Sequence, residues 1–181
     1  MSENIGEKLK FKFWFGIVLM FLLATVLHFV YDWSGGNKFL GLFFPVNESV
    51  WEHLKLLILP ITLWWIIIFK TDGQKLGLDR NRWTTGCLVS LVSAMLFTVA
   101  FYYTYTQAFG FESVALDILD TLLSITFGQI VGMHIYKHSK GINALVAETL
   151  ILLIVIMFVV FTLYPPNLPI FYDKVARKYG M

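Results

Sequence analysis

The sequence is poor in charged residues and in cysteine. Charged residues make up only 14% of the 181-residue chain and hydrophobic residues 57%, whereas a soluble domain is about one quarter charged. This composition excludes a soluble globular domain and predicts a membrane protein. The formal net charge of +2 gives no basis for nucleic-acid binding. The single cysteine, Cys87, excludes an intramolecular disulfide and any two-cysteine redox motif.

Long apolar runs dominate the rest of the chain. Because a membrane-spanning helix needs about 20 mostly apolar residues, we predict an all-α polytopic membrane bundle of five transmembrane helices. We expect these helices to form one integral membrane domain over residues 1–181. The predicted spans lie near 12–31, 50–69, 83–109, 115–136 and 143–164.

Basic residues are divided unequally between the two ends of these spans. Since basic residues concentrate on the cytoplasmic side, the distribution predicts an inner N-terminus and an outer C-terminus. The length of the apolar run 13–30 favours an uncleaved first span over a signal peptide. The inner side would carry Lys8, Lys10, Lys12, Lys70, Lys75, Arg80, Arg82, Lys137 and Lys140, and the outer side Lys38, Lys55, Lys174, Arg177 and Lys178.

The segment P-V-N-E-S-V-W-E-H-L-K, Pro45–Lys55, places ionisable residues at the start of the second span. The apolar run 56–69 that follows is too short to cross a bilayer alone. The span must therefore begin near residue 50, which puts Glu52 and His53 at membrane depth. Ionisable groups cost free energy there, so they are a functional-site hypothesis by default.

Polar residues from four segments are expected to meet at the outer side. Imidazole and carboxylate together suit zinc or manganese, and oxygen ligands alone suit magnesium or calcium. A divalent metal ion would lower the pKa of a bound water, although acid–base catalysis without metal is also open. We predict that the metal ligands are His28, Asp32, His53 and Asp117, and that the catalytic carboxylates are Glu48, Glu52 and Asp120. The proline-rich segment Tyr164–Asp173 cannot continue a helix and is expected to be an extended or turning segment at the outer surface.

Structural roles explain several of the same residues equally well. Ser49 and Glu52 fit an S-x-x-E capping box, and Glu52 and Lys55 have the spacing of an i,i+3 ion pair. Asp117 and Asp120 also fit an acidic first turn of the fourth span. The case for a site therefore depends on the convergence of these residues and not on any one of them.

A smaller polar group is predicted at the inner side. The pair His134 and His138 has the H-x-x-x-H spacing found in a superfamily of seven-span zinc-dependent lipid amidases and receptors. This chain differs from that pattern, because it has five spans and no further aspartate or histidine at that depth. We expect a His134–Glu148 hydrogen bond that steadies the last hairpin. The Gly128-x-x-x-Gly132 pattern predicts close helix packing within the bundle.

Three motifs resemble those of a family of small multi-span membrane proteins of Gram-positive bacteria, which is catalogued only as a domain of unknown function. They are H-F-V-Y-D-W-S-G (28–35), P-V-N-E-S-V-W-E-H-L-K-L (45–56) and Y-P-P-N-L-P-I-F-Y-D (164–173). The resemblance covers nearly the whole chain and implies a multi-pass protein of a bacterial plasma membrane. It supplies no activity, cofactor or catalytic residue.

The leading functional hypothesis is a metal-dependent, membrane-embedded hydrolase or transferase that acts on a lipid or an envelope precursor. One alternative is a small permease, ion-conducting or solute-binding protein, which would favour a homo-oligomer because five spans without a repeat do not suit a monomeric carrier. Another is an accessory subunit whose polar groups only fix helix packing. A water-lined path from Asp120 to His134 would favour transport, and an outer pocket above a closed inner half would favour the enzyme.

Overall fold

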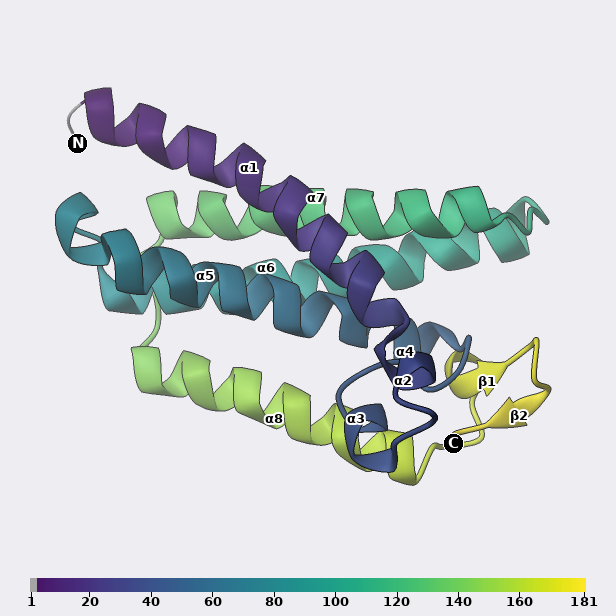
Figure 1. Cartoon of the computed structure of the whole chain (residues 1–181). Coiled ribbons are helices and arrows are strands. Elements are labelled where there is room, and N and C mark those ends of the chain that lie inside the picture. Colours follow the sequence, from purple (N-terminus) through teal and green to yellow (C-terminus); the bar gives the residue numbers. More distant parts are fainter. Residues whose placement is uncertain (1–2) are drawn as a thin grey trace.

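Five long helices form the body of the protein, for which the computed structural model describes residues 3–181 (Figure 1). Each is long and apolar enough to cross a membrane, which confirms the predicted all-α membrane bundle. The direction in which the chain crosses remains a prediction. The long helices are α1 (Glu3–His28), α5 (Lys55–Leu76), α6 (Arg80–Tyr103), α7 (Val114–His138) and α8 (Ala144–Leu163).

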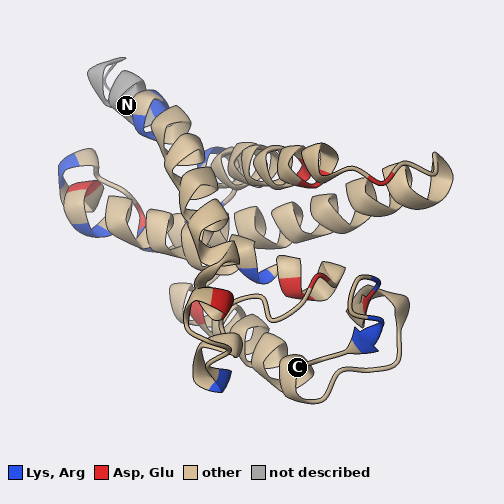
Figure 2. Cartoon of the chain, turned by 45° about the vertical axis from the view of Figure 1, so that its right-hand side comes forward, with Lys and Arg blue, Asp and Glu red and all other residues tan. Residues whose placement is uncertain are grey.

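The short elements gather at one end of the bundle, which is the predicted outer end (Figure 1). Charged residues lie mostly toward the two ends of the long helices, and their middles are largely uncharged (Figure 2). The short elements are α2 (Val30–Trp33), α3 (Lys38–Gly41), α4 (Val50–His53), the π-helical turn η1 (Thr104–Ala108), the 3₁₀ turn η2 (Pro169–Phe171), and the antiparallel strands β1 (Tyr172–Asp173) and β2 (Lys178–Tyr179).

Helices α6 and α7 approach each other closely through small residues. A Cβ atom added to Gly128 would lie 2.4 Å from the carbonyl oxygen of Ser90, and one added to Gly132 would lie 2.5 Å from that of Gly86. Real Cβ atoms do not come this close, so both positions require glycine. The small-xxx-small pattern therefore packs within the bundle, as predicted. The Gln129 amide donates a hydrogen bond to Ser90 Oγ at 2.9 Å across the same contact.

Helix α8 packs mainly against α6 and is the least buried of the five spans. Its outer end is attached to α4 by aromatic packing, because Trp51 stacks on Phe158 with ring centroids 4.2 Å apart. Trp51 also packs against Phe171 of η2, at 4.6 Å. One tryptophan at the start of the second span thus joins α8 and the C-terminal segment to the outer end of the bundle.

At the opposite end of the bundle, which is the predicted inner end, ion pairs join the helices in place of the predicted hydrogen bond. Glu148 of α8 receives three hydrogen bonds from the guanidinium of Arg80, two from Nη2 at 2.9 and 3.0 Å and one from Nε at 3.3 Å. The expected His134–Glu148 hydrogen bond is therefore wrong. The planar Arg80 side chain, at the start of α6, binds a carboxylate through two parallel N–H groups. Lys12 and Asp72 form a second pair, at 2.6 Å, between α1 and α5.

Gly128→Ala is predicted to destabilise the bundle, because the new methyl group would meet the Ser90 carbonyl oxygen and force α6 and α7 apart. Overpacking of this kind costs about 1–3 kcal/mol. Thermal unfolding in detergent measures the effect. The control is Ala115→Leu, which enlarges an exposed residue of the same helix. Equal melting temperatures for Gly128→Ala and the wild type would contradict the packing described here.

Candidate functional site

The loop before α4 is held in place by side chains that accept hydrogen bonds from its backbone. The Val46 N–H donates to Glu52 Oε2 at 3.1 Å, and the Glu48 N–H donates to Asp173 Oδ2 at 3.2 Å. Both acceptor residues are 2% exposed. Because backbone N–H groups near a buried surface require partners, these two carboxylates determine the path of the loop.

The C-terminal hairpin braces the same loop from outside. Asp173 Oδ1 accepts hydrogen bonds from the backbone N–H groups of Val175 and Ala176, at 2.7 and 2.9 Å. The Asn47 side chain donates to the carbonyl oxygen of Gly180, at 3.0 Å. The hairpin is therefore folded around Asp173 and docked on the loop that carries Glu48.

Glu52 and Lys55 form a buried ion pair, with Oε2 and Nζ 2.6 Å apart and each residue 2% exposed. The second oxygen of Glu52 accepts a hydrogen bond from Thr162 of α8 at 3.0 Å. Lys55 also donates to the carbonyl oxygens of Gly41 and Phe44, at 2.8 and 3.3 Å. Of the roles weighed for Glu52 from the sequence, its contacts match the ion pair and not an acid–base group.

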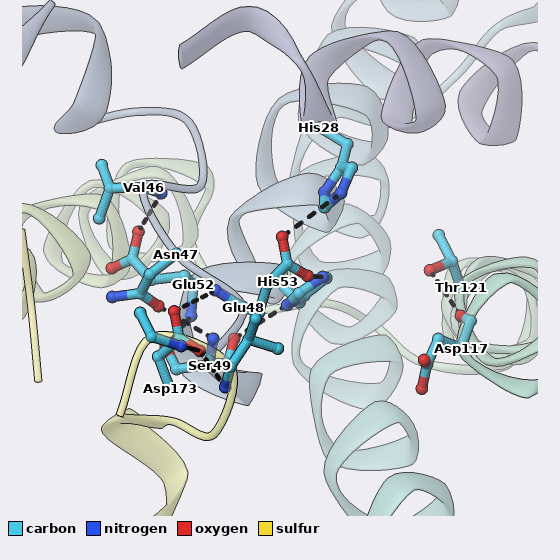
Figure 3. Close-up of polar contacts among 12 residues, drawn as sticks. His28, Val46, Asn47, Glu48, Ser49, Glu52, His53, Asp117, Thr121 and Asp173 are labelled. Carbon is cyan, nitrogen blue, oxygen red and sulfur yellow. Dashed lines mark hydrogen bonds and ion pairs between the residues drawn. The ribbon is translucent and has the colours of Figure 1, made fainter. Parts of the chain in front are cut away.

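Three other side chains converge beside this pair: His28 at the end of α1, Glu48 in the loop, and His53 at the end of α4. Each offers one ligand atom, and the three atoms lie within 4.8 Å of one another. Glu48 Oε1 is 3.8 Å from His28 Nε2, and Glu48 Oε2 is 3.4 Å from His53 Nε2. Figure 3 shows the Glu48 carboxylate directed toward both rings.

The backbone of α4 orients the His53 ring. Nδ1 of His53 lies 2.9 Å from the carbonyl oxygen of Ser49. A carbonyl can only accept a hydrogen bond, so Nδ1 carries a proton and Nε2 is the nitrogen that faces Glu48. This is how histidines that bind metal ions are usually held, with the second nitrogen donating to a carbonyl or carboxylate.

His28, Glu48 and His53 are called the trio below, and two of them differ in charge and orientation. Hydrogen bonding from His53 is the largest cause of a lowered pKa for the Glu48 carboxyl, and it outweighs the opposing effect of burial. Glu48 is therefore ionised at neutral pH and able to bind a cation. Nδ1 of His28 is buried without a hydrogen-bond partner among residues 3–181, so this ring is less completely oriented than that of His53.

Two cavities meet at the trio. The larger, of about 370 Å³, extends toward α6 and the C-terminal hairpin. The smaller, of about 230 Å³, extends between α1 and α7. Glu48 and His53 line both cavities, whereas His28 lines only the smaller one. The residues that both share are Glu48, His53, Val114, Asp117 and Thr121.

Asp117 and Asp120 of α7 line the larger cavity opposite the trio. Asp120 is 3% exposed, and its Oδ1 accepts a hydrogen bond from Ser124 Oγ at 2.9 Å. Ser124 in turn accepts one from Thr98 of α6, at 2.7 Å. Asp117 accepts a hydrogen bond from the hydroxyl of Tyr105. Both aspartates thus face the cavity with one oxygen fixed by a hydroxyl group.

Asp32 and Glu52 stand outside this arrangement, and neither is among the residues that line the two cavities. Helix α1 ends at His28 and α2 begins at Val30. His28 and Asp32 therefore do not lie on one continuous helix, although their spacing of four suggested a shared face. Asp32 is exposed.

Sequence reasoning missed the roles of Tyr105 and Asp173. Tyr105 lies in a tyrosine- and threonine-rich run at the end of a span, which is typical of an interfacial belt and gave no separate signal. Asp173 ends the proline-rich motif. An acidic residue after a non-helical segment at the membrane surface was the available sign that it binds backbone N–H groups.

Comparison with known proteins identifies the family. The model of a family of unknown function, DUF6512, matches residues 1–181. The chain belongs to DUF6512. No curated protein and no solved structure matches it. Membership in DUF6512 covers the full length and assigns no activity, so the function has to be argued from the geometry of the trio and its cavities.

Glu52→Gln is predicted to lower the stability of this DUF6512 protein, because it leaves the Lys55 charge buried without its counter-ion. Removing one partner of a buried ion pair costs about 3–5 kcal/mol. The melting temperature in detergent should fall, and replacing Lys55 by Met in the same chain should restore part of it.

The matched control is Glu112→Gln, which removes a carboxylate from an exposed pair with Lys174 whose side chains are 78% and 49% exposed. Exposed pairs contribute little to stability. If Glu52→Gln melted at the same temperature as Glu112→Gln, the structural role assigned to Glu52 would be wrong.

Proposed function

We propose that the protein is a metal-dependent hydrolase of the bacterial plasma membrane that acts at the outer boundary of the bilayer on a lipid or an envelope precursor. His28, Glu48 and His53 would bind one divalent ion. The observation that carries the proposal is the meeting of three ligand atoms within 4.8 Å, with Nδ1 of His53 already bound to a backbone carbonyl.

The donor set favours zinc. Two imidazoles and one carboxylate are the ligands of many catalytic zinc sites, where a fourth position stays open for water or substrate. All-oxygen sites, which magnesium and calcium prefer, would not use two histidines. Nε2 of His53, the nitrogen that faces Glu48, would bind the ion in its deprotonated form, since metal ligands must be deprotonated.

A site of this kind supports hydrolysis. The ion would lower the pKa of a water molecule from about 15.7 to near 7. Asp120 would accept the proton of that water as its oxygen attacks the carbonyl carbon or phosphorus of the substrate. The bond to the leaving oxygen or nitrogen then breaks, and Asp120 returns the proton to the leaving group. An alcohol in place of water would make the same reaction a transfer.

The arrangement of the carboxylates supports this assignment for Asp120. Its Oδ1 is fixed by Ser124 at 2.9 Å, while the cavity on its other side is lined by Glu48 and His53. Asp117 shares the cavity but accepts the hydroxyl of Tyr105, and we assign it to the positioning of substrate.

Among the residues whose side chains the structure describes (10–181), the packing of the inner half supports an enzyme over an ion pathway. A cavity that these residues line there has a volume of about 10 Å³, which is room for no more than a single water. It is enclosed by large side chains, among them Trp65, Trp83 and Met133. The two large cavities that contain ionisable groups open at the other end of the helices. A transport route would need polar space through both halves.

Purified wild-type protein, saturated with zinc and freed of excess ion, is predicted to hold one zinc per chain by elemental analysis. His53→Ala and Glu48→Gln should lose it, because each removes a ligand. Asp120→Asn should keep it, since Asp120 is assigned to proton transfer and not to binding the ion.

The control for non-specific binding is the double variant His134→Ala/His138→Ala, which removes the exposed histidines of the inner end and should retain the ion. Zinc lost in this double variant but kept in His53→Ala would contradict the proposal. A folded wild type without zinc, or with several zinc ions of equal affinity, would contradict it as well.

A further inference from the structure

The smaller cavity lies within the membrane-spanning part of the protein and has mostly apolar walls. It runs between the outer half of α1 and the first turns of α7, and its volume is about 230 Å³. Two of its wall residues are shielded from the surroundings, with Ala24 0% and Leu56 5% exposed. The apolar residues of its walls are Phe21, Ala24, Phe29, Leu56, Val114 and Ile118.

Exposed apolar side chains line this cavity. Phe29, Val114 and Ile118 are 42%, 73% and 54% exposed; Phe29 directly follows α1, and the other two lie at the start of α7. Exposed apolar side chains at this level of a spanning helix are in contact with lipid. The opening between α1 and α7 therefore presents apolar side chains to the bilayer, while the half-exposed carboxylate of Glu48 lines the same cavity.

The far end of the cavity reaches the candidate metal site, because His28, Glu48 and His53 are all among its lining residues. The larger cavity adjoins it there, because both have Glu48 and His53 in their walls, and its lining also includes Tyr102, Glu112 and Lys174. An apolar cavity and a second cavity with many polar lining residues thus lie on either side of the ligand atoms.

We infer, building on the proposed function, that the substrate is a membrane amphiphile that reaches the site sideways between α1 and α7. Its hydrocarbon chain occupies the smaller cavity and its polar group occupies the larger one, so the bond to be cleaved lies at the trio. A hydrocarbon chain moves between two apolar surroundings here, so it has little desolvation free energy to overcome. A water-soluble substrate would leave the apolar cavity empty.

The groove between α6 and α8 provides an internal comparison. It is larger, about 450 Å³, and its walls include Leu88, Val92, Leu153 and Met157, with no ionisable residue among them. A lipid chain can rest there as on any apolar surface of a membrane protein. Unlike this groove, the cavity between α1 and α7 combines apolar walls with access to the ligand atoms.

The test uses zinc-loaded protein in vesicles of phosphatidylcholine that carries a photoactivatable diazirine in one acyl chain. After illumination, digestion and mass spectrometry locate the labelled residues. We expect labelling of Leu56, which lipid can reach only from inside the cavity. Leu91, which is 0% exposed in the bundle core, should stay unlabelled, and Met157 should be labelled as an ordinary lipid contact.

Two variants at Thr25 sharpen the test, because this exposed residue lines the cavity and its hydroxyl bonds only to the Phe21 carbonyl of its own helix, at 3.0 Å. Thr25→Phe fills the mouth and should reduce the labelling of Leu56 to the level of Leu91. Thr25→Val keeps the space and should leave it unchanged. Labelling of Met157 should be the same in both variants.

Metal content, measured on the same samples, separates this inference from the proposed function. Wild-type protein that binds its ion but shows no more label at Leu56 than at Leu91 would overturn lateral access and leave the metal site standing. Unchanged labelling in Thr25→Phe would also overturn it. Label at Leu56 in a protein that binds no ion would support the lipid path and overturn the proposed function.

Discussion

The buried ion pair of Glu52 and Lys55 is the constraint on which the outer end of the protein depends. Two charges 2.6 Å apart at 2% exposure are tolerated only if their remaining hydrogen-bonding groups are also satisfied. Glu52 accepts hydrogen bonds from the Val46 backbone N–H and from the hydroxyl of Thr162 in α8. Lys55 donates to the carbonyl oxygens of Gly41 and Phe44. The free-energy cost of burying the two charges thus fixes the positions of these segments relative to one another.

The two glutamates of one short motif consequently have different roles. Glu52 is buried and both of its carboxylate oxygens accept hydrogen bonds. The side chain of Glu48, in contrast, is 50% exposed and faces His28 and His53. Asp173 holds the backbone of Glu48, so the exposed carboxylate stands on a rigid support. Functional groups need such support, because ligands have to be placed within about half an ångström of their working positions.

The sequence predicted the parts of this structure that depend on composition and spacing. Five spans follow from hydropathy, and their ends bring the polar residues together whatever the packing details. The sequence could not show which of Glu48 and Glu52 belongs to the site. That depends on how Lys55 is bound, and the loop carbonyl groups that bind Lys55 meet it only in the folded chain. The break after His28, which separates it from Asp32, and the pairing of Glu148 with Arg80 are likewise outcomes of three-dimensional contacts.

The central claim is that His28, Glu48 and His53 bind one zinc ion. Zinc K-edge X-ray absorption on the loaded protein tests it most directly, because the spectrum reports the ligand atoms themselves. The account predicts two imidazole nitrogens at about 2.0–2.1 Å and light-atom ligands in the remaining positions, and no bound zinc to give this spectrum in His53→Ala. A first shell without imidazole scattering, or one that is unchanged in His53→Ala, would contradict it.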